Sequence, residues 1–544
     1  MANHFNRVGG LKPRRNAFDL SYRVATTCDM GELIPIQCDE AVPGDTWTMG
    51  AHLTVRLQPM VAPVYHEITA HIHTFFVPFR IMWPQWETFI ASDVSNVPVA
   101  LPRINSTGAN VDRFTLWDYF GLETGSPTGG IGSIRNPVAW PWMAYNTVYN
   151  EYYRDQDIQT IPVNLYNGNV LRRNWRKDYF TAARPFRQKG VAPALPVNVS
   201  LQYSAPAVGY PDNWQAARFA APGFLVGSSR YSGNVTNSDS IPTGSTDMTV
   251  NVASVNTFGA FEGQLGVNKT EIFASEVPRI SANSTTFDVS DLRLAIQTQK
   301  WLERNARGGT RYTEFLRSHF GVAPSDARLH RPEYIGGIRL PINISEVLQT
   351  SETSSTALAT MAGHGLGSDG QYIGKYHVQE YGVIISLLSV MPKPSYSTGI
   401  NRQWLRLLPT DYYFPEFAHL SEQAIYNQEI FAGYGNLEQN MGIFGYTGQY
   451  DEMRVKHDLC TGEMRSWRPP GVQPVNPQLN YWTMSREFFG NVNLNSNFIE
   501  CNPTRRIFAV TSSNYKTLIV NCRNLIKAVR PMPLIAEPGL VDHF

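Results

Sequence analysis

The chain has 544 residues, with 46 Lys and Arg against 45 Asp and Glu, so its net charge of +1 excludes a general attraction to nucleic acids or membranes. Charged residues make up 17% of the sequence, below the usual share of about 25%, and aromatic residues make up 12%. Few charges combined with many aromatic side chains are typical of surfaces that partners cover. The length is sufficient for a large core, in one β-rich unit or in several domains.

The N-terminal 44 residues are predicted to form a basic arm and the segment that leads into the folded domain. Within the first 23 residues, glycines and a proline interrupt regular structure, and Asp19 is the single acid. The cations of this stretch are Arg7, Lys12, Arg14, Arg15 and Arg23. The pattern predicts a mobile basic arm, and a solvated terminus that carries charge for solubility is the alternative.

Extended segments rich in β-branched and aromatic residues occur at both ends of the chain. Strands are predicted between residues 45 and 78 (over 45–59 and 66–78), over 376–392 and, within 505–533, over 505–513 and 516–533. Strands from both ends, separated by long connections, favour one β-sandwich over residues 45–544 with expanded loops.

Helices are predicted inside these connections. The stretch 288–309 begins near a Ser or Asp cap, carries an apolar stripe and stops at Gly308-Gly309. Residues 313–321 form a second, shorter helix, and residues 141–156 are a third candidate. These elements place most of the chain in the connections of the sandwich.

The motif HIHTFFVPFRIMW begins with His71 and His73, which strict alternation places on one face of a strand. A His-x-His pair on a strand can share one metal ion, as at the start of cupin metal sites. Such a site also needs a nearby carboxylate, and no acid follows before Glu87. The sequence therefore predicts no metal centre here.

Other catalytic signatures are absent from the sequence. It contains no GxSxG, no HExxH and no GxxxxGK[ST] motif. The glycine-rich stretch AGHGLGSDG, residues 362–370, has no lysine and is predicted to be a flexible loop. The cysteines are odd in number, scattered and without a CxxC pair, which predicts free thiols in a reducing cytosol.

The segment 197–285 contains only ten charged residues, and 20 of the 34 residues from Gly227 to Ala260 are Gly, Ser, Thr or Asn. Short alternating pieces such as MTVNVASV, residues 248–255, predict short strands in an inserted, protruding subdomain. This segment either contacts an external partner or is a surface loop without a specific function.

A basic-aromatic segment, LRRNWRKDYFTAARPFRQKG, spans residues 171–190. Cations interleaved with aromatic rings suit single-stranded nucleic acid, because the cations follow phosphates and the rings stack on bases. Arginines that bridge acids on a neighbouring subunit give the same pattern. The candidate contacts to DNA are Arg172, Arg173, Arg176 and Lys177.

Several long motifs occur in a fixed order and resemble those of the major capsid proteins of the Microviridae, gokushovirus type. They are WMAYNTVYNEYYRDQ, RKDYFTAARPFRQKG, ARLHRPEYIGG, SVMPKPSYSTGINRQW, DYYFPEFAHLSEQAIYNQE, GYTGQYDEMRV and RPMPLIAEPGLVDHF. The resemblance covers the chain from FNRVGGLKPRRNAFDLS to the last residues, except for about 197–285.

The resemblance implies a mainly β fold: a single eight-stranded antiparallel jelly-roll with very long insertion loops that contain a few helices. It also implies a T=1 icosahedral shell of 60 copies around a circular single-stranded DNA genome of a bacteriophage. The basic arm would face inward, with Arg7, Lys12, Arg14 and Arg15 neutralising phosphates. The insertion at 197–285 would form a protrusion that meets a receptor on the host cell.

Further partners follow from the same resemblance: an internal scaffolding protein, a small basic DNA-binding protein and a DNA-pilot protein. The function is then assembly in the virion, after production in the host bacterial cytoplasm, with no catalytic residues, no cofactor and no membrane insertion. Two rival interpretations are a cupin-like β-sandwich metalloenzyme, which would need a bound metal, and a carbohydrate-binding β-module, which would be a soluble monomer.

Overall fold

The computed structural model describes residues 14–91, 100–104, 111–124, 137–193, 289–348, 350, 361–433, 437–465, 477–488, 490, 492–512 and 514–535. The chain divides into two units, residues 1–192 together with 299–544, and residues 193–298. The predicted protrusion at 197–285, including its predicted strands, lies outside the described residues.

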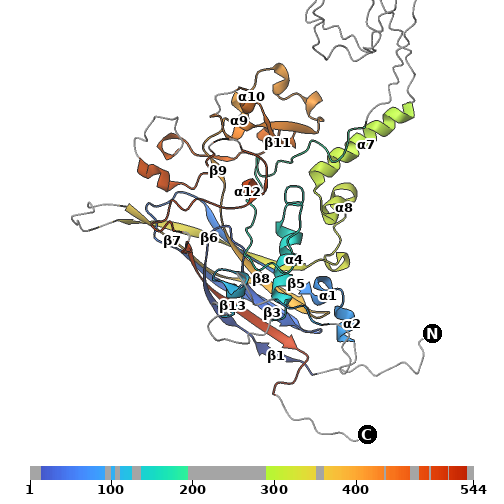
Figure 1. The fold of residues 1–544 in the computed structure, drawn as a ribbon, viewed down its shortest axis with the longest axis vertical. Coiled ribbons are helices and arrows are strands. Elements are labelled where there is room, and N and C mark those ends of the chain that lie inside the picture. The colour runs from blue at the N-terminus through green and yellow to red at the C-terminus, as the bar shows by residue number, and fades with distance from the viewer. Residues whose placement is uncertain are drawn as a thin grey trace, which may run out of the picture. The chain divides into compact units, whose positions relative to one another are not determined.

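Most described strands belong to one large antiparallel sheet (Figure 1). The strands are β1 (Asn16–Asp19), β2 (Tyr22–Cys28), β3 (Ile34–Ala41), β4 (Thr46–Leu57), β5 (Ile68–Pro78), β6 (Glu333–Leu348), β7 (Met361–His377), β8 (Gly382–Pro392), β9 (Ser395–Tyr396), β10 (Glu422–Tyr426), β11 (Ile443–Gly448), β12 (Asp458–Leu459) and β13 (Leu518–Arg530).

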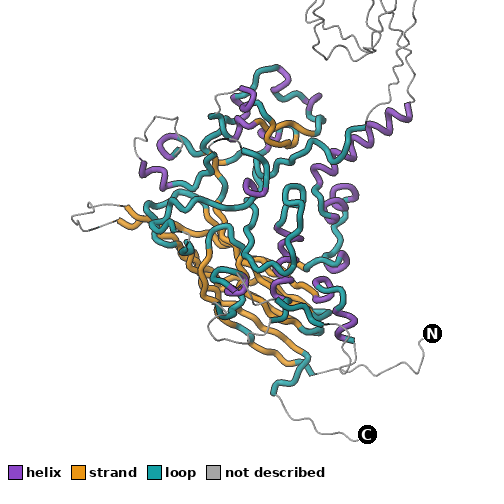
Figure 2. The backbone as a smooth tube through the Cα atoms, viewed as in Figure 1, coloured by secondary structure: helices purple, strands orange, loops and turns teal. Residues whose placement is uncertain are grey.

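Helices fill the connections, together with long stretches of irregular chain (Figure 2). The α-helices are α1 (Phe79–Met82), α2 (Trp86–Ile90), α3 (Leu116–Tyr119), α4 (Trp140–Val148), α7 (Val289–Gly308), α8 (Tyr312–Phe320), α9 (Asn427–Ile430), α10 (Leu437–Asn440), α11 (Asp451–Arg454) and α12 (Ser496–Ile499). The π-helix η3 (Tyr149–Tyr153) continues α4, and the short 3₁₀ helices are η5 (Ala327–Leu329), η6 (Arg402–Trp404), η7 (Pro409–Asp411), η8 (Pro415–Phe417), η9 (Gly462–Met464) and η10 (Pro477–Trp482). The helices predicted at 141–156, 288–309 and 313–321 correspond to α4 with η3, α7 and α8.

The main sheet has the strand order β1–β13–β4–β7–β6–β5–β8–β3, and β2 also pairs with β13. Residues 527–530 of β13 pair with β1 and residues 518–524 with β2, so these two short strands share one edge position. Eight strand positions remain, in two groups of four that a hairpin between residues 343–348 and 361–366 joins into one curled sheet. This arrangement is that of a jelly-roll, which confirms the predicted fold class.

The main core lies between the two groups of strands. Along β4 and β13, alternate residues such as Trp47, Leu53, Val520 and Ile526 are buried, and the residues between them face away from the core. This period of two follows from strand geometry. Each fully buried large apolar side chain contributes about 1.5–3 kcal/mol by leaving water.

A second core lies on the other face of β5 and β8. Helices α1 and α4 pack there, and they bring Phe79, Trp142 and Tyr145 against Ile385 and Leu387 (Figure 1). Every residue of β8 is therefore buried. Burial on both faces explains why this strand has a continuous apolar sequence without alternation.

Three predictions of secondary structure are wrong. Residues 16–41, assigned to the arm and the segment after it, form β1, β2 and β3 of the main sheet. Residues 505–513 form no extended strand in their described part and make a single bridge, between Phe508 and Met60. The predicted loop at 362–370 is part of β7.

The glycines of β7 explain the third of these errors. A side chain at Gly363 would bring its Cβ to 2.6 Å from the carbonyl oxygen of Ala62, and one at Gly367 to 3.1 Å from that of Pro341. Glycine is therefore needed where neighbouring backbones approach closely, although it weakens the local signal for a strand. The glycine-rich pattern of residues 362–370, which predicted a flexible loop, is therefore explained by the close packing of neighbouring backbones.

Candidate functional site

The histidine pair lies on β5 and is covered by the chain that follows α4. His73 Nδ1 and the hydroxyl of Tyr153 are hydrogen-bonded at 2.8 Å, and His71 Nε2 and the hydroxyl of Thr69 at 3.1 Å. Burial lowers the pKa of His71 to about 3 and that of His73 to about 4, and the positive charge of Arg173 adds to both shifts. Both imidazoles are thus neutral at pH 7.

These surroundings suit packing better than metal binding. The ring of His73 stacks on that of Tyr153, with centroids 6.0 Å apart, and the guanidinium of Arg173 opposes a second cation. Within the described ranges, no group of three or more His, Cys, Asp and Glu side chains is arranged to hold a metal ion.

The first cations of the basic-aromatic segment bind the protein's own backbone and side chains. Arg172 Nη1 donates to the carbonyl oxygens of Met30 at 3.1 Å and Cys501 at 3.2 Å. Arg173 Nη1 donates to Ser389 Oγ at 3.0 Å, and burial lowers the pKa of its guanidinium. Both residues tie the segment to the sheet and to the chain that precedes β13.

The next two cations form intramolecular ion pairs. Arg176 lies 3.7 Å from Glu67, and its side chain is 40% exposed. Lys177 Nζ donates to Asp155 Oδ2 at 2.6 Å and to the carbonyl oxygen of Thr181 at 3.0 Å. All four candidate DNA contacts of this segment therefore have partners within the chain.

The aromatic rings of the segment are also engaged. Trp175, Tyr179 and Phe180 are at most 5% exposed. Phe180 packs on Tyr396 with ring centroids 4.8 Å apart, and the guanidinium of Arg486 lies 5.1 Å from the ring of Trp175. These rings have no free face on which a base could stack.

Two neighbouring acids anchor the second half of the segment. Asp155 pairs with Lys177 and Arg184, and Asp157 pairs with Arg184 at 2.7 Å and Lys189 at 3.0 Å. Burial alone would raise the pKa of Asp155, but the charges and hydrogen bonds of Lys177 and Arg184 hold it below its ordinary value. The sequence predicted bridging of acids on another subunit as one alternative, and the structure places such acids in the same chain.

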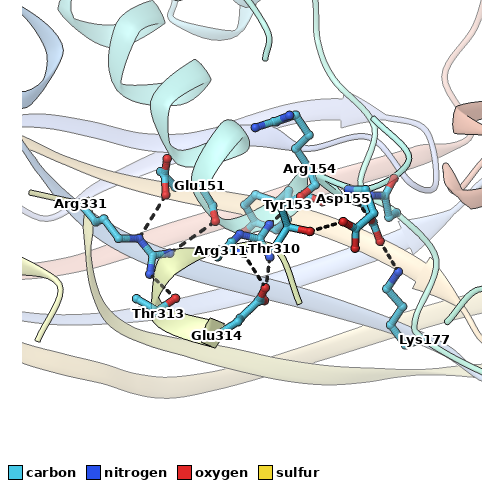
Figure 3. A network of polar contacts seen from close by, with 12 residues as sticks. Glu151, Tyr153, Arg154, Asp155, Lys177, Thr310, Arg311, Thr313, Glu314 and Arg331 are labelled. Atoms are coloured by element: carbon cyan, nitrogen blue, oxygen red, sulfur yellow. Dashed lines mark hydrogen bonds and ion pairs between the residues drawn. The ribbon is translucent and has the colours of Figure 1, made fainter. Parts of the chain in front are cut away.

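The polar network continues to α8 and the chain beyond it (Figure 3). Arg331 Nε donates to Glu151 Oε2 at 3.1 Å, and Arg311 Nη1 donates to Glu314 Oε1 at 3.0 Å. A second nitrogen of Arg311 donates to the carbonyl oxygen of Arg154. These contacts join α8 and the chain beyond it to the chain at the end of α4 and η3.

The candidates in the N-terminal arm lie at the edge of the sheet. Arg14 and Arg15 are exposed and directly precede β1. Arg7 and Lys12 lie outside the described residues. The structure thus leaves Arg14 and Arg15 open to solvent.

An exposed apolar surface that the sequence did not predict lies on residues 400–420, here called the apolar loop. Its exposed large apolar side chains are those of Ile400, Trp404, Leu407, Leu408, Tyr412, Tyr413, Phe414 and Leu420. Leu407 is 83% exposed and Trp404 74%. The signal in the sequence is an aromatic, proline-interrupted stretch that has neither helical nor strand periodicity.

The apolar loop is held in shape by polar contacts. The carboxylate of Asp411 accepts hydrogen bonds from the backbone amides of Leu407 and Leu408, both at 2.8 Å, and these bonds lower its pKa. Arg402 Nη1 donates to the buried Glu429 at 3.0 Å. The loop therefore presents its apolar side chains from a fixed backbone, which is typical of a protein contact surface.

A jelly-roll that presents an exposed apolar loop on a fixed backbone is typical of a structural protein that acts by association. The profile of the family described as capsid protein (F protein) matches residues 7–540, so the chain belongs to that family. It is a Microviridae major capsid protein of the gokushovirus type.

Three relatives are similar over nearly their whole length. Capsid protein VP1 of Chlamydia phage 1 is 31% identical, over 99% of this chain and 98% of the relative. Capsid protein VP1 of Bdellovibrio phage phiMH2K is 30% identical with the same coverage, and that of Spiroplasma virus 4 is 29% identical over 98% and 97%.

Family membership assigns a structural role, self-assembly into a capsid and a place in the virion. No helix of the described part of the chain is long and apolar enough to cross a membrane.

Proposed function

We propose that the chain assembles as 60 copies into a T=1 icosahedral shell that encloses a circular single-stranded DNA genome. The observation that carries the assembly is the apolar loop, which exposes aromatic and aliphatic side chains on a backbone fixed by Asp411 and Arg402. Large apolar side chains that converge on one preformed surface are the usual centre of a protein interface. Another copy of this chain is the partner that family membership supports.

Packaging is proposed to involve the N-terminal arm. Arg7, Lys12, Arg14 and Arg15 would neutralise phosphates in a salt-sensitive way that tolerates any sequence. Replacing Lys12, Arg14 and Arg15 by Gln is expected to reduce the DNA per particle, and unchanged content would refute this role. The intramolecular partners of Arg172, Arg173, Arg176 and Lys177 favour a structural role for those four.

Host attachment is assigned to residues 197–285 as a surface protrusion. Its low charge and its richness in Ser, Thr, Asn and Gly support a contact surface toward a receptor on the host cell. We further propose an internal scaffolding protein, a small basic DNA-binding protein and a DNA-pilot protein as partners, with assembly in the host bacterial cytoplasm.

The mass of the native material tests the assembly. Sixty copies of a 61.1 kDa chain give roughly 3.7 MDa of protein, measured by light scattering after size-exclusion chromatography. The ratio of absorbance at 260 to 280 nm on the same peak tests the DNA. A soluble monomer that stays monomeric after addition of the scaffolding protein would refute the proposal, and a protein-only particle would refute packaging alone.

A pair of variants tests the apolar loop as the contact surface. Leu407→Asp places a charge on a side chain that is 83% exposed, so the fold of the subunit is expected to stay intact while particles are lost. Ile161→Asp is the matched control, because Ile161 is equally exposed at 83% but lies outside the loop. Wild-type yields of particles from Leu407→Asp would remove the loop from the interface.

A further inference from the structure

One face of the jelly-roll sheet has exposed cations that form no ion pair with the described residues of the chain. This open face is the side of β2, β13, β4 and β7 that points away from the main core, where alternate residues are exposed. Its basic side chains, all exposed, are Arg23, Arg56, Lys375, Arg523 and Lys527. Helices α1, α3 and α4 pack on β3, β5 and β8, in the other group of strands.

The acids on this face are few and engaged locally. Asp19 accepts hydrogen bonds from the hydroxyl and the backbone amide of Ser21, and these bonds lower its pKa. Asp19 also stands opposite Lys527 in the register of β1 with β13, and the charges of Lys527 and Arg523 lower its pKa further. Among the described residues, no carboxylate forms an ion pair with any of the five cations. Arg23 Nε donates to the neutral amide oxygen of Asn521 at 2.6 Å.

The strand register sets like charges close together. Arg23 lies directly opposite Arg523, and such a pair destabilises a sheet when nothing neutralises it. In a second row, Thr48 stands between Lys375 and Lys527, which are therefore two strand spacings apart, roughly 10 Å. Along β13, Arg523 and Lys527 are four residue steps apart, which is about 13 Å. The face thus carries five exposed cations in a regular register, with the acid Asp19 opposite one of them, Lys527.

Some of the side chains between the cations are small and polar, and one aromatic ring is exposed among them. Thr48, Thr54 and Asn521 stand between some of the charges, and Tyr372, 64% exposed, stands opposite Gly50 on the same face. Exposed apolar side chains lie there too: Leu525 stands between Arg523 and Lys527, and Ile519 and Leu366 stand opposite Arg56. Cations that follow phosphates, next to a ring on which a base can stack, are the elements of a surface that binds single strands.

We propose that the open face binds the phosphate backbone of the packaged single-stranded DNA without sequence preference. The inference rests on the proposed packaging of DNA and names the surface that performs it. Arg14 and Arg15 precede β1, which pairs with the end of β13, so the arm continues the same basic surface. A second copy of the chain is a weaker match, because acids such as Asp29, Asp155 and Glu429 are already paired within the chain.

The test neutralises part of the face and compares the DNA per particle. The variant Arg56→Gln/Arg523→Gln/Lys527→Gln removes three exposed charges while sparing Arg23, which bonds Asn521. The matched control Lys300→Gln/Arg304→Gln/Arg317→Gln removes three exposed charges from α7 and α8. Particles are purified after nuclease treatment, and both the shell mass and the DNA content are measured.

The expected result is shells of wild-type mass in which the open-face variant holds at least twofold less DNA, while the control retains wild-type content. A conservative variant, Arg56→Lys/Arg523→Lys, is expected to restore the DNA, because it keeps the charge. Wild-type DNA content in the open-face variant would overturn the inference, as would an equal loss in both triple variants.

Two further outcomes separate the inference from the function on which it rests. Folded subunits of the open-face variant that fail to form shells would show that the face contacts protein, and would overturn the inference. Wild-type shells that contain no DNA would refute packaging itself, and the inference with it.

Discussion

The basic-aromatic segment and the open face carry similar numbers of cations, but those of the segment have partners within the chain and those of the open face are exposed to solvent. In the segment, Lys177 and Arg184 are paired with Asp155, and the rings of Trp175 and Phe180 are buried. On the open face, the cations are exposed and form no ion pair among the described residues. A cluster of charges along the sequence is therefore a poor guide to free charge on the surface.

The difference has a physical origin. A long insertion that must cover the outer face of β5 and β8 needs polar anchors, and arginine supplies several donors to carbonyl oxygens and carboxylates. Arg172 and Arg173 serve in this way. On the strands of the open face, solvent-facing residues alternate with core residues and anchor no insertion. Their cations can therefore bind an external anion.

The largest expected effect comes from removing a buried ring of the segment. Phe180→Ala is expected to lower the free energy of unfolding by about 3–5 kcal/mol, because Phe180 is 1% exposed and its loss leaves a cavity. Urea unfolding followed by tryptophan fluorescence measures this. Phe186→Ala, in the same segment but only partly buried, is the control and should cost less. Unchanged stability with a loss of DNA would mean that the ring stacks on bases.

The sequence predicted those parts of the fold in which local patterns and packing agree. The strands β4, β5 and β13 and the helices α7 and α8 lie where their periodicity placed them. Part of β7 was predicted as a loop because it contains glycines such as Gly363, which are needed where another backbone approaches closely. Local patterns do not contain this long-range requirement.

The open face was missed for a related reason. Arg23 and Arg523 stand directly opposite each other in the sheet but are separated by most of the chain. In the segment 171–190 the cations are adjacent along the chain, so they stand out in the sequence, but the sequence does not show which acids neutralise them. Residues brought together by register become visible only with the structure.

The second prediction concerns the acid that holds the segment. Asp155→Asn is expected to cost about 3 kcal/mol, the low end for a broken buried pair, because Lys177 and Arg184 stay partly exposed. Since Lys177 and Arg184 hold the folded-state pKa of Asp155 below 3.8, its contribution is present above that pH and is lost as the pH falls through the folded-state pKa. Unfolding curves at pH 7 and pH 3 should therefore differ less for the variant, and an equal pH dependence would contradict the role assigned to Asp155.

The third prediction concerns His71 and His73, which the segment covers. Their pKa values of about 3 and about 4 in the folded state lie below the ordinary 6.5, so the unfolded chain takes up protons first. The stability that they provide is complete well above pH 6.5, and it is expected to fall by up to about 2 kcal/mol for each histidine between pH 6.5 and pH 4.5. Calorimetry across this range measures the slope, and His71→Gln/His73→Gln should reduce it. A wild-type slope in the double variant would place the titrating groups elsewhere.

The smallest effect is expected at the residue of the segment that could best reach DNA. Arg176 is 40% exposed and lies 3.7 Å from Glu67, which Arg339 also contacts at 2.9 Å, so Glu67 keeps a partner when Arg176 is lost. Arg176→Gln should therefore change the free energy of unfolding by less than about 0.5 kcal/mol. The DNA content of the particles should also stay at the wild-type level. Arg56→Gln on the open face, which removes one exposed charge of the same type, is the matched comparison, and a larger loss of DNA from Arg176→Gln would reverse the assignment of the two regions.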